Sequence, residues 1–415
     1  MEKRIVILGG GTGGTLLANR LRRRFDDLDL RIDVVDRDDV HVYQPGLLFV
    51  PFGLAEPEEI VRPRRRQLHG GIGFHQAEIE SVELAAQTVH LEDGTALPYD
   101  VLVVASGARL LPEETEGLLG AGWNETAFTF YTVDGATKLR DALARFHGGR
   151  LVVDIADMPI KCPVAPIEFA FLADWFLREK GVRDRSEIVL ATPLDGCFTK
   201  PIASKHLTYL LDEKGIDLQV EFSAGEVDGA ARKLVSYDGR EVDYDLLAIV
   251  PLHGGAAFVE RSDGLGDALG FVPTDPATLQ SLAAPNVFAI GDATNLPSSK
   301  AGSVTHFEGE ILTENIERFL TGRELVPRFD GHANCFVETG FHKALLIDFN
   351  YDTEPVPGRF PTAVGPLPLL RESRLNHLGK LMFQWIYWHM LLPGRELPLV
   401  GPEMPTAGKR IPTAV

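Results

Sequence analysis

A strand running into a Gly-rich loop near the N-terminus, a second strand–loop–helix pattern near residue 150, and an aromatic C-terminal stretch together predict the fold class. They indicate an α/β protein with two Rossmann-like dinucleotide-binding domains and a C-terminal membrane-associating segment. The chain has 415 residues and is 45% hydrophobic, which suits two full-sized cores and an appendage.

Composition excludes several classes of function. The formal charge of −18 and the pI of about 5.1 argue against a nucleic-acid partner, and they provide no broad attraction to anionic lipid. Three cysteines do not indicate a disulfide-stapled secreted framework. The opening residues lead straight into a strand, so we expect no secretory signal. Asp, Glu and His show no clustered ligand spacing, and we predict no metal.

The first unit carries the strongest motif. Residues 4–8 read as a buried strand, and Gly9, Gly11 and Gly14 after it fit G-x-G-x-x-G, with Thr12 inside the loop and a helix over 15–21. The first glycine allows the tight turn, the second lets the backbone approach a pyrophosphate, and the third lets the helix pack on the strand. A second strand over 32–36 ends in Asp36, which we expect to hold an adenosine ribose.

The rest of the first unit surrounds the expected cofactor. Residues 39–49 form an aromatic loop punctuated by Gly and Pro, and the four arginines within 62–66 favour a solvated basic turn. Residues 78–84 and 88–91 alternate like a small antiparallel sheet. The strand over 99–104 ends in Ala105-Ser106-Gly107, whose small side chains let the backbone lie against a cofactor.

The second unit repeats this plan but lacks its nucleotide-binding residues. After the strand over 150–155, where a second Gly-rich loop is expected, the chain reads Met158-Pro159-Ile160-Lys161-Cys162-Pro163. The next strand, 187–190, ends in Ala-Thr-Pro rather than in an acid. Since both the phosphate glycines and the ribose carboxylate are missing, we expect a thiol site in place of a pyridine nucleotide. The strand over 244–251 matches the one over 99–104 and indicates an internal duplication.

The chain then returns to the first unit and ends in an appendage. Residues 286–294 form an apolar strand ending in Gly291-Asp292, where a carboxylate can accept a hydrogen bond from a cofactor sugar. Cys335 precedes an alternating strand over 344–351. The run 381–392 has no charged residue and is too short to span a bilayer. Either a core helix or an interfacial helix fits this run.

These stretches together resemble the sulfide:quinone oxidoreductase family, kin of flavocytochrome c sulfide dehydrogenase and type II NADH dehydrogenase. The most specific motifs are Tyr43-Gln44-Pro45-Gly46, Cys162 in the second loop, Cys335, and the Trp/Tyr-rich tail. The resemblance implies a redox-active pair of cysteines, Cys162 and Cys335, and FAD bound without a covalent link, since the first 161 residues contain no cysteine. Cys197 matches no family cysteine.

The resemblance also implies the division of the chain and the cofactor residues. We expect an FAD-binding domain from 1–108 and 271–322, a second Rossmann-like domain over 109–270, and a quinone- and membrane-interacting region over 323–415. The predicted FAD-binding residues are Gly9, Gly11, Thr12, Gly14, Asp36, Arg37, Gln44, Ala77, Ala105, Ser106, Gly107, Asp292, Gly302 and Lys380.

The implied reaction oxidises hydrogen sulfide to sulfane sulfur or polysulfide. Hydrosulfide attacks the Cys162–Cys335 bridge and leaves a persulfide, and the electrons pass through FAD to a membrane quinone. This chemistry needs a lowered thiol pKa, for which Lys380 and Lys343 are candidate cations. Glu168 is the candidate general base, and a carboxylate that starts the following helix is the alternative interpretation.

The expected protein is a peripheral membrane protein of the cell membrane, on a face that the sequence does not indicate. A homo-oligomer is compatible with it. A soluble sulfide dehydrogenase, a type II NADH dehydrogenase and a flavin-binding regulatory protein are the alternatives.

Overall fold

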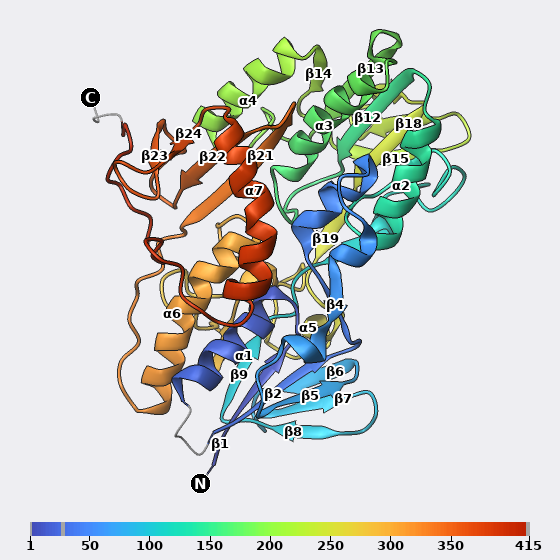
Figure 1. Ribbon diagram of the computed structural model, residues 1–415. Coiled ribbons are helices and arrows are strands. Elements are labelled where there is room, and N and C mark those ends of the chain that lie inside the picture. The colour runs from blue at the N-terminus through green and yellow to red at the C-terminus, as the bar shows by residue number, and fades with distance from the viewer. Residues whose placement is uncertain (1, 26–29, 412–415) are drawn as a thin grey trace.

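In the computed structural model, which describes residues 2–25 and 30–411, two five-stranded parallel sheets have the same strand plan. The first, at the bottom of Figure 1, has the order β20 (Val287–Ala289), β9 (Val101–Val104), β1 (Lys3–Leu8), β2 (Leu30–Asp36) and β5 (Ile72–Gln76). The second, at the upper right, has the order β11 (Ala127–Phe128), β18 (Leu246–Val250), β12 (Gly149–Ile155), β13 (Ser186–Ala191) and β14 (Ile216–Gln219). The matching orders confirm the predicted duplication, and β20 beside β9 confirms the return of the chain to the first sheet.

Helices cover both sheets, because each helix has an apolar face that is buried against the sheet. The helices of the first unit are α1 (Thr12–Arg24), α6 (Gly302–Leu320) and the short α5 (Ala257–Glu260). Those of the second are α2 (Val133–Arg145), α3 (Ala165–Glu179) and α4 (Pro201–Glu213). Helices α1 and α6 pack on each other, and α3 packs on β12 and β13. Helix α1 is longer than the predicted 15–21 because it begins inside the Gly-rich loop.

Small antiparallel elements decorate the two units. They are β3 (Val40–Val42) with β4 (Val61–Pro63); β6 (Ile79–Glu83), β7 (Thr88–Leu91) and β8 (Ala96–Pro98); β10 (Arg109–Leu111) with β19 (Leu252–Gly254); and β15 (Ala224–Asp228), β16 (Lys233–Ser236) and β17 (Glu241–Asp243). The β6–β7 pair confirms the small sheet predicted over 78–91. Strands β10 and β19 are the two connections between the units, and they pair with each other.

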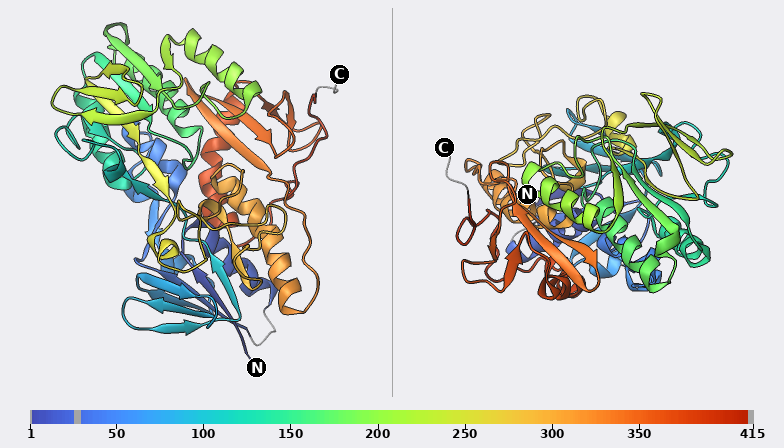
Figure 2. Two further views of the ribbon diagram at one scale, coloured as in Figure 1. Left: turned by 180° about the vertical axis from the view of Figure 1, so that it is seen from behind. Right: turned by 90° about the horizontal axis from the view of Figure 1, so that it is seen from above.

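The C-terminal region forms a third part, at the upper left of Figure 1. It contains the hairpin β21 (Ala333–Gly340) and β22 (Lys343–Phe349), the pair β23 (Gly358–Phe360) and β24 (Leu367–Leu369), and α7 (Arg374–Ile386), which continues as one π-helical turn, η8 (Tyr387–Leu391). Helix α7 packs on β21 and β22. The views from behind and above in Figure 2 show the same hairpin beside α6 and α4.

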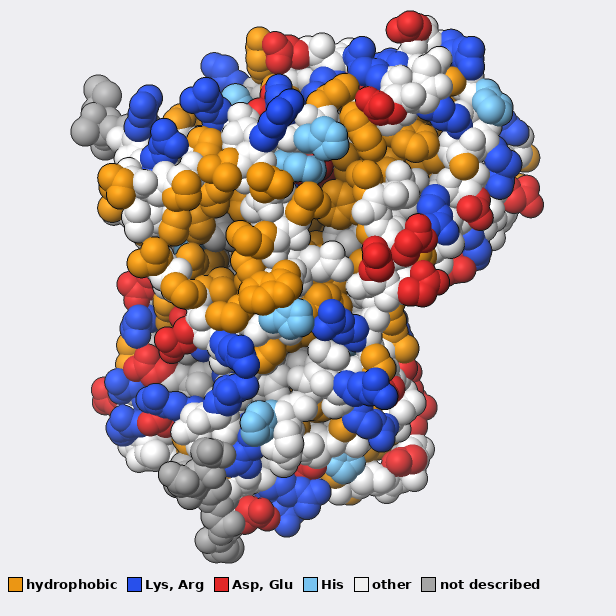
Figure 3. Space-filling model, viewed as in Figure 1, with side chains coloured by type: hydrophobic (Ala, Val, Ile, Leu, Met, Phe, Trp, Pro, Cys, Tyr) orange, Lys and Arg blue, Asp and Glu red, His pale blue; other side chains and the backbone are white. Residues whose placement is uncertain are grey.

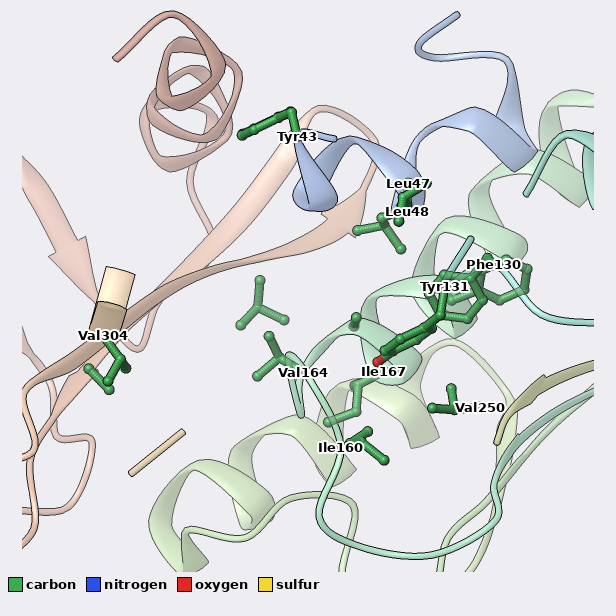
Figure 4. Packing of buried hydrophobic residues seen from close by; sticks show 14 of the residues in the cluster. Tyr43, Leu47, Leu48, Phe130, Tyr131, Ile160, Val164, Ile167, Val250 and Val304 are labelled. Atoms are coloured by element: carbon green, nitrogen blue, oxygen red, sulfur yellow. The ribbon is translucent and has the colours of Figure 1, made fainter. Parts of the chain in front are cut away.

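One continuous hydrophobic core joins all three parts. Figure 4 shows Leu47 and Leu48, on the 3₁₀ turn η1 (Gln44–Leu48) of the first unit, on the side of Phe130 and Ile167 of the second, with Tyr43 just before the turn. The same cluster includes Tyr387 and Trp388 from the C-terminal turn. Since burying such side chains stabilises by about 1.5–3 kcal/mol each, the parts are held as one body.

Candidate active site between the two units

The Gly-rich turn leaves an open, electropositive helix end. A Cβ on Gly9, whose φ is +102°, would lie 2.5 Å from the carbonyl oxygen of Ala105, and one on Gly14 would lie 1.8 Å from the oxygen of Gly9. A Cβ on Gly11 would meet nothing within 4 Å. Helix α1 has no side-chain cap and no acid in its first turn. Its free amides therefore suit a pyrophosphate.

Asp36 is held beside this turn by two partners. Its carboxylate accepts a hydrogen bond from Gly10 N at 2.7 Å and lies 2.7 Å from Arg64 Nη1. Burial raises the pKa of Asp36, and Arg64 opposes that rise. The expected solvated basic turn is therefore wrong at Arg64, which is buried, and Arg62 lies over the ring of Trp388 at 4.1 Å.

The small residues after β9 and β20 also face open space. Gly107 has φ +67° and room for a Cβ, and the buried hydroxyl of Ser106 has no hydrogen-bond partner among the described residues. Asp292 follows β20, and burial raises its pKa while Lys300 and Lys161 lower it. Gly302 begins α6, another helix end without a side-chain cap. An unpaired hydroxyl beside two free helix ends fits a large polar cofactor such as FAD.

The other predicted cofactor residues lie in different surroundings. Thr12 Oγ1 is 2.7 Å from the hydroxyl of Tyr387. Arg37 is exposed and pairs with Asp38, and Ala77 N donates to the carbonyl of Asp36. Gln44 accepts a hydrogen bond from Lys161 Nζ at 3.2 Å, which places it beside the Cys162 loop rather than at the Gly-rich turn.

The loop over 156–164 holds Cys162 against the first unit. Cys162 N donates to Lys300 O at 2.7 Å, and its own carbonyl accepts from Ala165 N as α3 begins. The Tyr131 hydroxyl donates to Lys161 O at 2.8 Å. Cys162 has a φ of +48°, a strained conformation for a residue with a side chain. The loop thus places the thiol at the boundary with the segment that follows Asp292.

Cys335, on β21, belongs to the same group of thiol and charged side chains as Cys162. The charges of the Glu168 carboxylate and the Lys380 ammonium act on both thiols, and both cysteines are partly buried. Burial, then Glu168, raises the pKa of Cys162 far above its ordinary value and that of Cys335 to about 12, although Lys380 opposes both shifts. The expectation of lowered thiol pKa values is therefore wrong for this structure. All three cysteines are free thiols.

A buried ion pair lies beside the two thiols. Lys380 Nζ donates to Glu168 Oε1 and, at 2.9 Å, to Phe336 O, while Glu338 N donates to the same Glu168 oxygen at 2.6 Å. Glu168 lies in the first turn of α3, although Ala165 rather than Glu168 begins that helix. Burial raises the pKa of Glu168, against the opposing charge of Lys380. This carboxylate is therefore a candidate for proton exchange with the neighbouring ionisable groups.

Two predicted participants lie elsewhere. Lys343 is exposed, and its charge acts on Lys214 rather than on the thiols, so it is not a cation of this site. Cys197 is buried at the start of α4, where its thiol contacts Ser204 O at 3.3 Å and Thr208. Sequence reasoning missed Tyr131 and Glu338, which have no local signal of function because their partners are distant in the chain.

The C-terminal helix has one buried and one exposed apolar face. Asn376, Lys380 and Tyr387 face inward. The exposed face, which we call the α7 apolar face, consists of Leu375, Leu378, Leu381, Met382 and Trp385. Figure 3 shows apolar side chains gathered over this helix. The run 381–392 therefore has a buried face, as a core helix has, and an exposed apolar face.

No helix in residues 2–25 and 30–411 is both long and apolar enough to cross a membrane. Within the same residues, no group of three or more His, Cys, Asp or Glu side chains is placed to hold a metal ion.

Comparison with known proteins first indicates the broad class of protein that this chain resembles. Residues 3–154 match the model of the pyridine nucleotide-disulphide oxidoreductase family. A solved sulfide:quinone oxidoreductase from Aquifex aeolicus shares the fold, with a TM-score of 0.79 and 21% identity over 95% of this chain and 92% of that one.

Comparison of the sequence with individual proteins points to a narrower group of relatives. The chain is 26% identical to the mitochondrial sulfide:quinone oxidoreductase of Mus musculus over 397 residues, which cover 94% of this chain and 86% of the mouse protein. A type II NADH:quinone oxidoreductase of Mycobacterium tuberculosis is also 26% identical, but over 71% of this chain and 67% of its own length. These findings confirm the resemblance to the sulfide:quinone oxidoreductases.

Proposed function

We propose that this protein is an FAD-dependent sulfide:quinone oxidoreductase that oxidises hydrogen sulfide at Cys162 and Cys335. The observation that carries the proposal is the group of side chains around the loop over 156–164. Two thiols share one buried ion pair, Glu168 and Lys380, at the position where a second nucleotide would require a Gly-rich loop. The similarity to sulfide:quinone oxidoreductases over nearly the whole chain supports it.

The first unit would hold FAD. The amides at the start of α1 would bind the pyrophosphate, Asp36 and Arg64 lie where an adenosine ribose would reach, and Ser106 and Asp292 would bond the remaining polar groups. When bound, FAD accepts two electrons from the thiol pair and gives two to the quinone.

The residues of the chain would perform the sulfur chemistry. With Cys162 and Cys335 joined as a bridge, the hydrosulfide sulfur bonds to Cys162 Sγ while the bond between the two cysteine sulfurs breaks. The products are a persulfide on Cys162 and a thiolate on Cys335. Lys380 stabilises the thiolate, which burial otherwise disfavours, and Glu168 accepts the persulfide proton.

The geometry weighs against NADH as the electron donor. The loop over 156–164 lies against Lys300 through the Cys162 amide and has no glycine at which a pyrophosphate could approach. β13 ends in Ala191 with no acid to grip a ribose.

The quinone and membrane roles belong to the α7 apolar face. An exposed row with Leu381, Met382 and Trp385 on an amphipathic helix suits the boundary between headgroups and acyl chains. Because the protein carries a formal charge of −18, binding should be mainly hydrophobic and change little with salt. The protein would then be peripheral, with the quinone tail remaining in lipid.

Anaerobic addition of sulfide to the purified protein tests this function. We expect sulfide to bleach the bound flavin and added quinone to restore its oxidised spectrum, while micromolar NADH leaves the spectrum unchanged. A flavin that keeps its oxidised spectrum under sulfide would support the regulatory alternative, and rapid bleaching by NADH would support the dehydrogenase.

A further inference from the structure

A line of ionisable side chains leads from the buried ion pair to the surface. Glu168 and Lys380 are buried, and Glu338 on β21 is also buried. Next along the line, His377 is partly buried and His342, in the β21–β22 turn, is exposed. These five groups come from three elements, α3, β21 and α7, and from the turn between β21 and β22, so no local sequence motif contains them.

Hydrogen bonds and close contacts join most of this line. Glu338 N fixes Glu168 at 2.6 Å, and Lys380 Nζ, bonded to Glu168, also exerts its charge on the Glu338 carboxylate. His377 Nδ1 lies 2.9 and 3.0 Å from the two carboxylate oxygens of Glu338. The ring of His342 meets that of His377 edge-on, with centroids 5.5 Å apart. The line therefore ends at solvent.

The geometry of helix α7 explains why His377 and Lys380 both lie along this line. His377 and Lys380 are three residues apart on α7, so both side chains project from one face of the helix. That face packs on β21, where the Phe336 ring lies against Gly379 and Phe336 O accepts from Lys380. Glu338, two residues further along the strand, shares the side occupied by Phe336.

The proposed reaction needs such a route because it consumes more protons at the quinone than it releases from hydrosulfide. Hydrosulfide oxidised to sulfane sulfur on Cys162 gives up two electrons and one proton, whereas a quinone takes up two electrons and two protons. The balance is HS⁻ + quinone + H⁺ → sulfane sulfur + quinol. One proton must therefore enter from solvent in each turnover.

We propose that His377 and Glu338 deliver this proton to the buried Glu168–Lys380 pair, an inference that rests on the proposed function. His377 Nδ1 releases its proton to a Glu338 oxygen and regains one from solvent through Nε2. Glu338 passes the proton to Lys380 Nζ as another Nζ proton moves to Glu168. The proton then leaves the Glu168 carboxyl for a quinone oxygen, so one N–H or O–H bond breaks as each new one forms.

The groups that set the charge along this route come from every element packed against it. Glu168 lies on α3, Glu338 and Cys335 on β21, and Lys380 and His377 on α7, with Cys162 on the loop before α3 and His342 at the surface. Burial raises the pKa of Glu338, while Lys380, His377 and His342 oppose the rise. A proton can therefore rest on this carboxyl during transfer.

A purely structural role is the alternative, in which His377 only fastens α7 to β21. Three variants separate the two roles. His377→Asn can still bond to Glu338 but cannot relay a proton, and His377→Ala opens space for added imidazole. His147→Asn is the control, because His147 is an exposed histidine that belongs neither to this line nor to the α7 apolar face.

The measurement is the reoxidation of dithionite-reduced holoenzyme by a soluble short-chain quinone, followed as a function of pH in rapid mixing. We expect the His377→Asn variant to be slower by at least about tenfold. Its deficit should grow as pH rises, and imidazole should restore the His377→Ala variant but not the His377→Asn variant. The His147→Asn variant should match the unchanged protein, and all variants should unfold at similar urea concentrations.

Two failures can be told apart. An unchanged protein whose reduced form cannot be reoxidised by quinone overturns the proposed function. If the unchanged protein reacts but the His377→Asn variant equals it at every pH, or imidazole restores neither variant, the relay is wrong and His377 is structural.

Discussion

Tyr387→Phe should weaken both the fold and the binding of FAD, although Tyr387 lies far from the Gly-rich loop in sequence. The Tyr387 hydroxyl is buried and lies 2.7 Å from Thr12 Oγ1 and 2.7 Å from His41 Nε2. His41 Nδ1 faces Gly10 O at 3.2 Å and must donate to it. Burial and Arg64 lower the pKa of His41 to about 4, so its ring is neutral and Nε2 is an acceptor.

These assignments fix the direction of the network and the size of the effect. Tyr387 donates to His41 and accepts from Thr12, so removing one oxygen leaves the buried His41 ring and the half-buried Thr12 hydroxyl without their partner. A buried group left unpaired costs about 1–3 kcal/mol. Since Thr12 opens α1, the loss should reach the predicted pyrophosphate site as well as the fold.

Urea unfolding and a fluorescence titration of the apoprotein with FAD measure the two effects. We expect the free energy of unfolding to fall by about 1–3 kcal/mol and the FAD dissociation constant to rise. Tyr209→Phe is the control, because Tyr209 is exposed and bonds to Glu213 at the surface, and it should change stability by less than about 0.5 kcal/mol. Unchanged stability and FAD affinity in the Tyr387→Phe variant would refute the assigned network.

The same contacts correct a simpler experiment. Deleting the chain from Leu381 onward is the simplest way to remove part of the α7 apolar face. The structure places Tyr387 in the core that joins the C-terminal region to the first unit, and Asn19 of α1 donates to Leu392 O at 2.6 Å. The deletion would therefore damage the cofactor site, and point substitutions on the α7 apolar face are the better test.

Three further predictions concern the thiols, the membrane and pH. Cys162→Ser and Cys335→Ser should each abolish sulfide-dependent quinone reduction while FAD stays bound, whereas Cys197→Ser should lose much less. An inactive Cys197→Ser protein beside an active Cys335→Ser protein would show that the pairing is wrong. Joint replacement of Leu381 and Trp385 by Ser should weaken vesicle binding in flotation by at least about tenfold, whereas Leu282→Ser, an exposed leucine elsewhere, should not. Burial raises the pKa of Glu308 from its ordinary 4.5 to about 7, so native Glu308 binds a proton that the unfolded chain releases as pH rises between these values. Stability should fall by about 3 kcal/mol over that window, and Glu308→Gln should flatten this part of the urea-midpoint profile; an unchanged slope would contradict the shift.

The sequence predicted those features that depend on local pattern. Parallel strands such as 4–8 and 150–155 are short apolar runs with Gly or Pro after them, so their type and place were readable. Gly9 was assigned to a tight turn and Gly14 to close packing of the helix on the strand, and the structure shows the positive φ of Gly9 and the close approach of Gly14 to the oxygen of Gly9. The duplicated sheet order followed from the same repetition.

Features that depend on distant partners could not be read in the same way. Arg64 looked like one of four solvated arginines, and its burial against Asp36 depends on the fold of the intervening strands. The thiol pKa values were misjudged because Glu168 faces both cysteines together with Lys380, and burial outweighs that single cation. Proximity between residues more than 200 positions apart leaves no periodic signal in a single sequence.

The hydrogen bond from Cys162 N to Lys300 O ties the loop that carries one thiol to the first unit. Lys300 is itself anchored, because its ammonium donates to Asp292 O and Thr294 O at 2.9 and 2.7 Å. This main-chain bond ties the second unit to the first beside Cys162, and Lys300 cannot shift without losing its own two bonds as well. A ligand that required the loop over 156–164 to move away from Lys300 would first have to break the bond. The contact that positions the Cys162 thiol therefore also opposes movement of the loop that carries it.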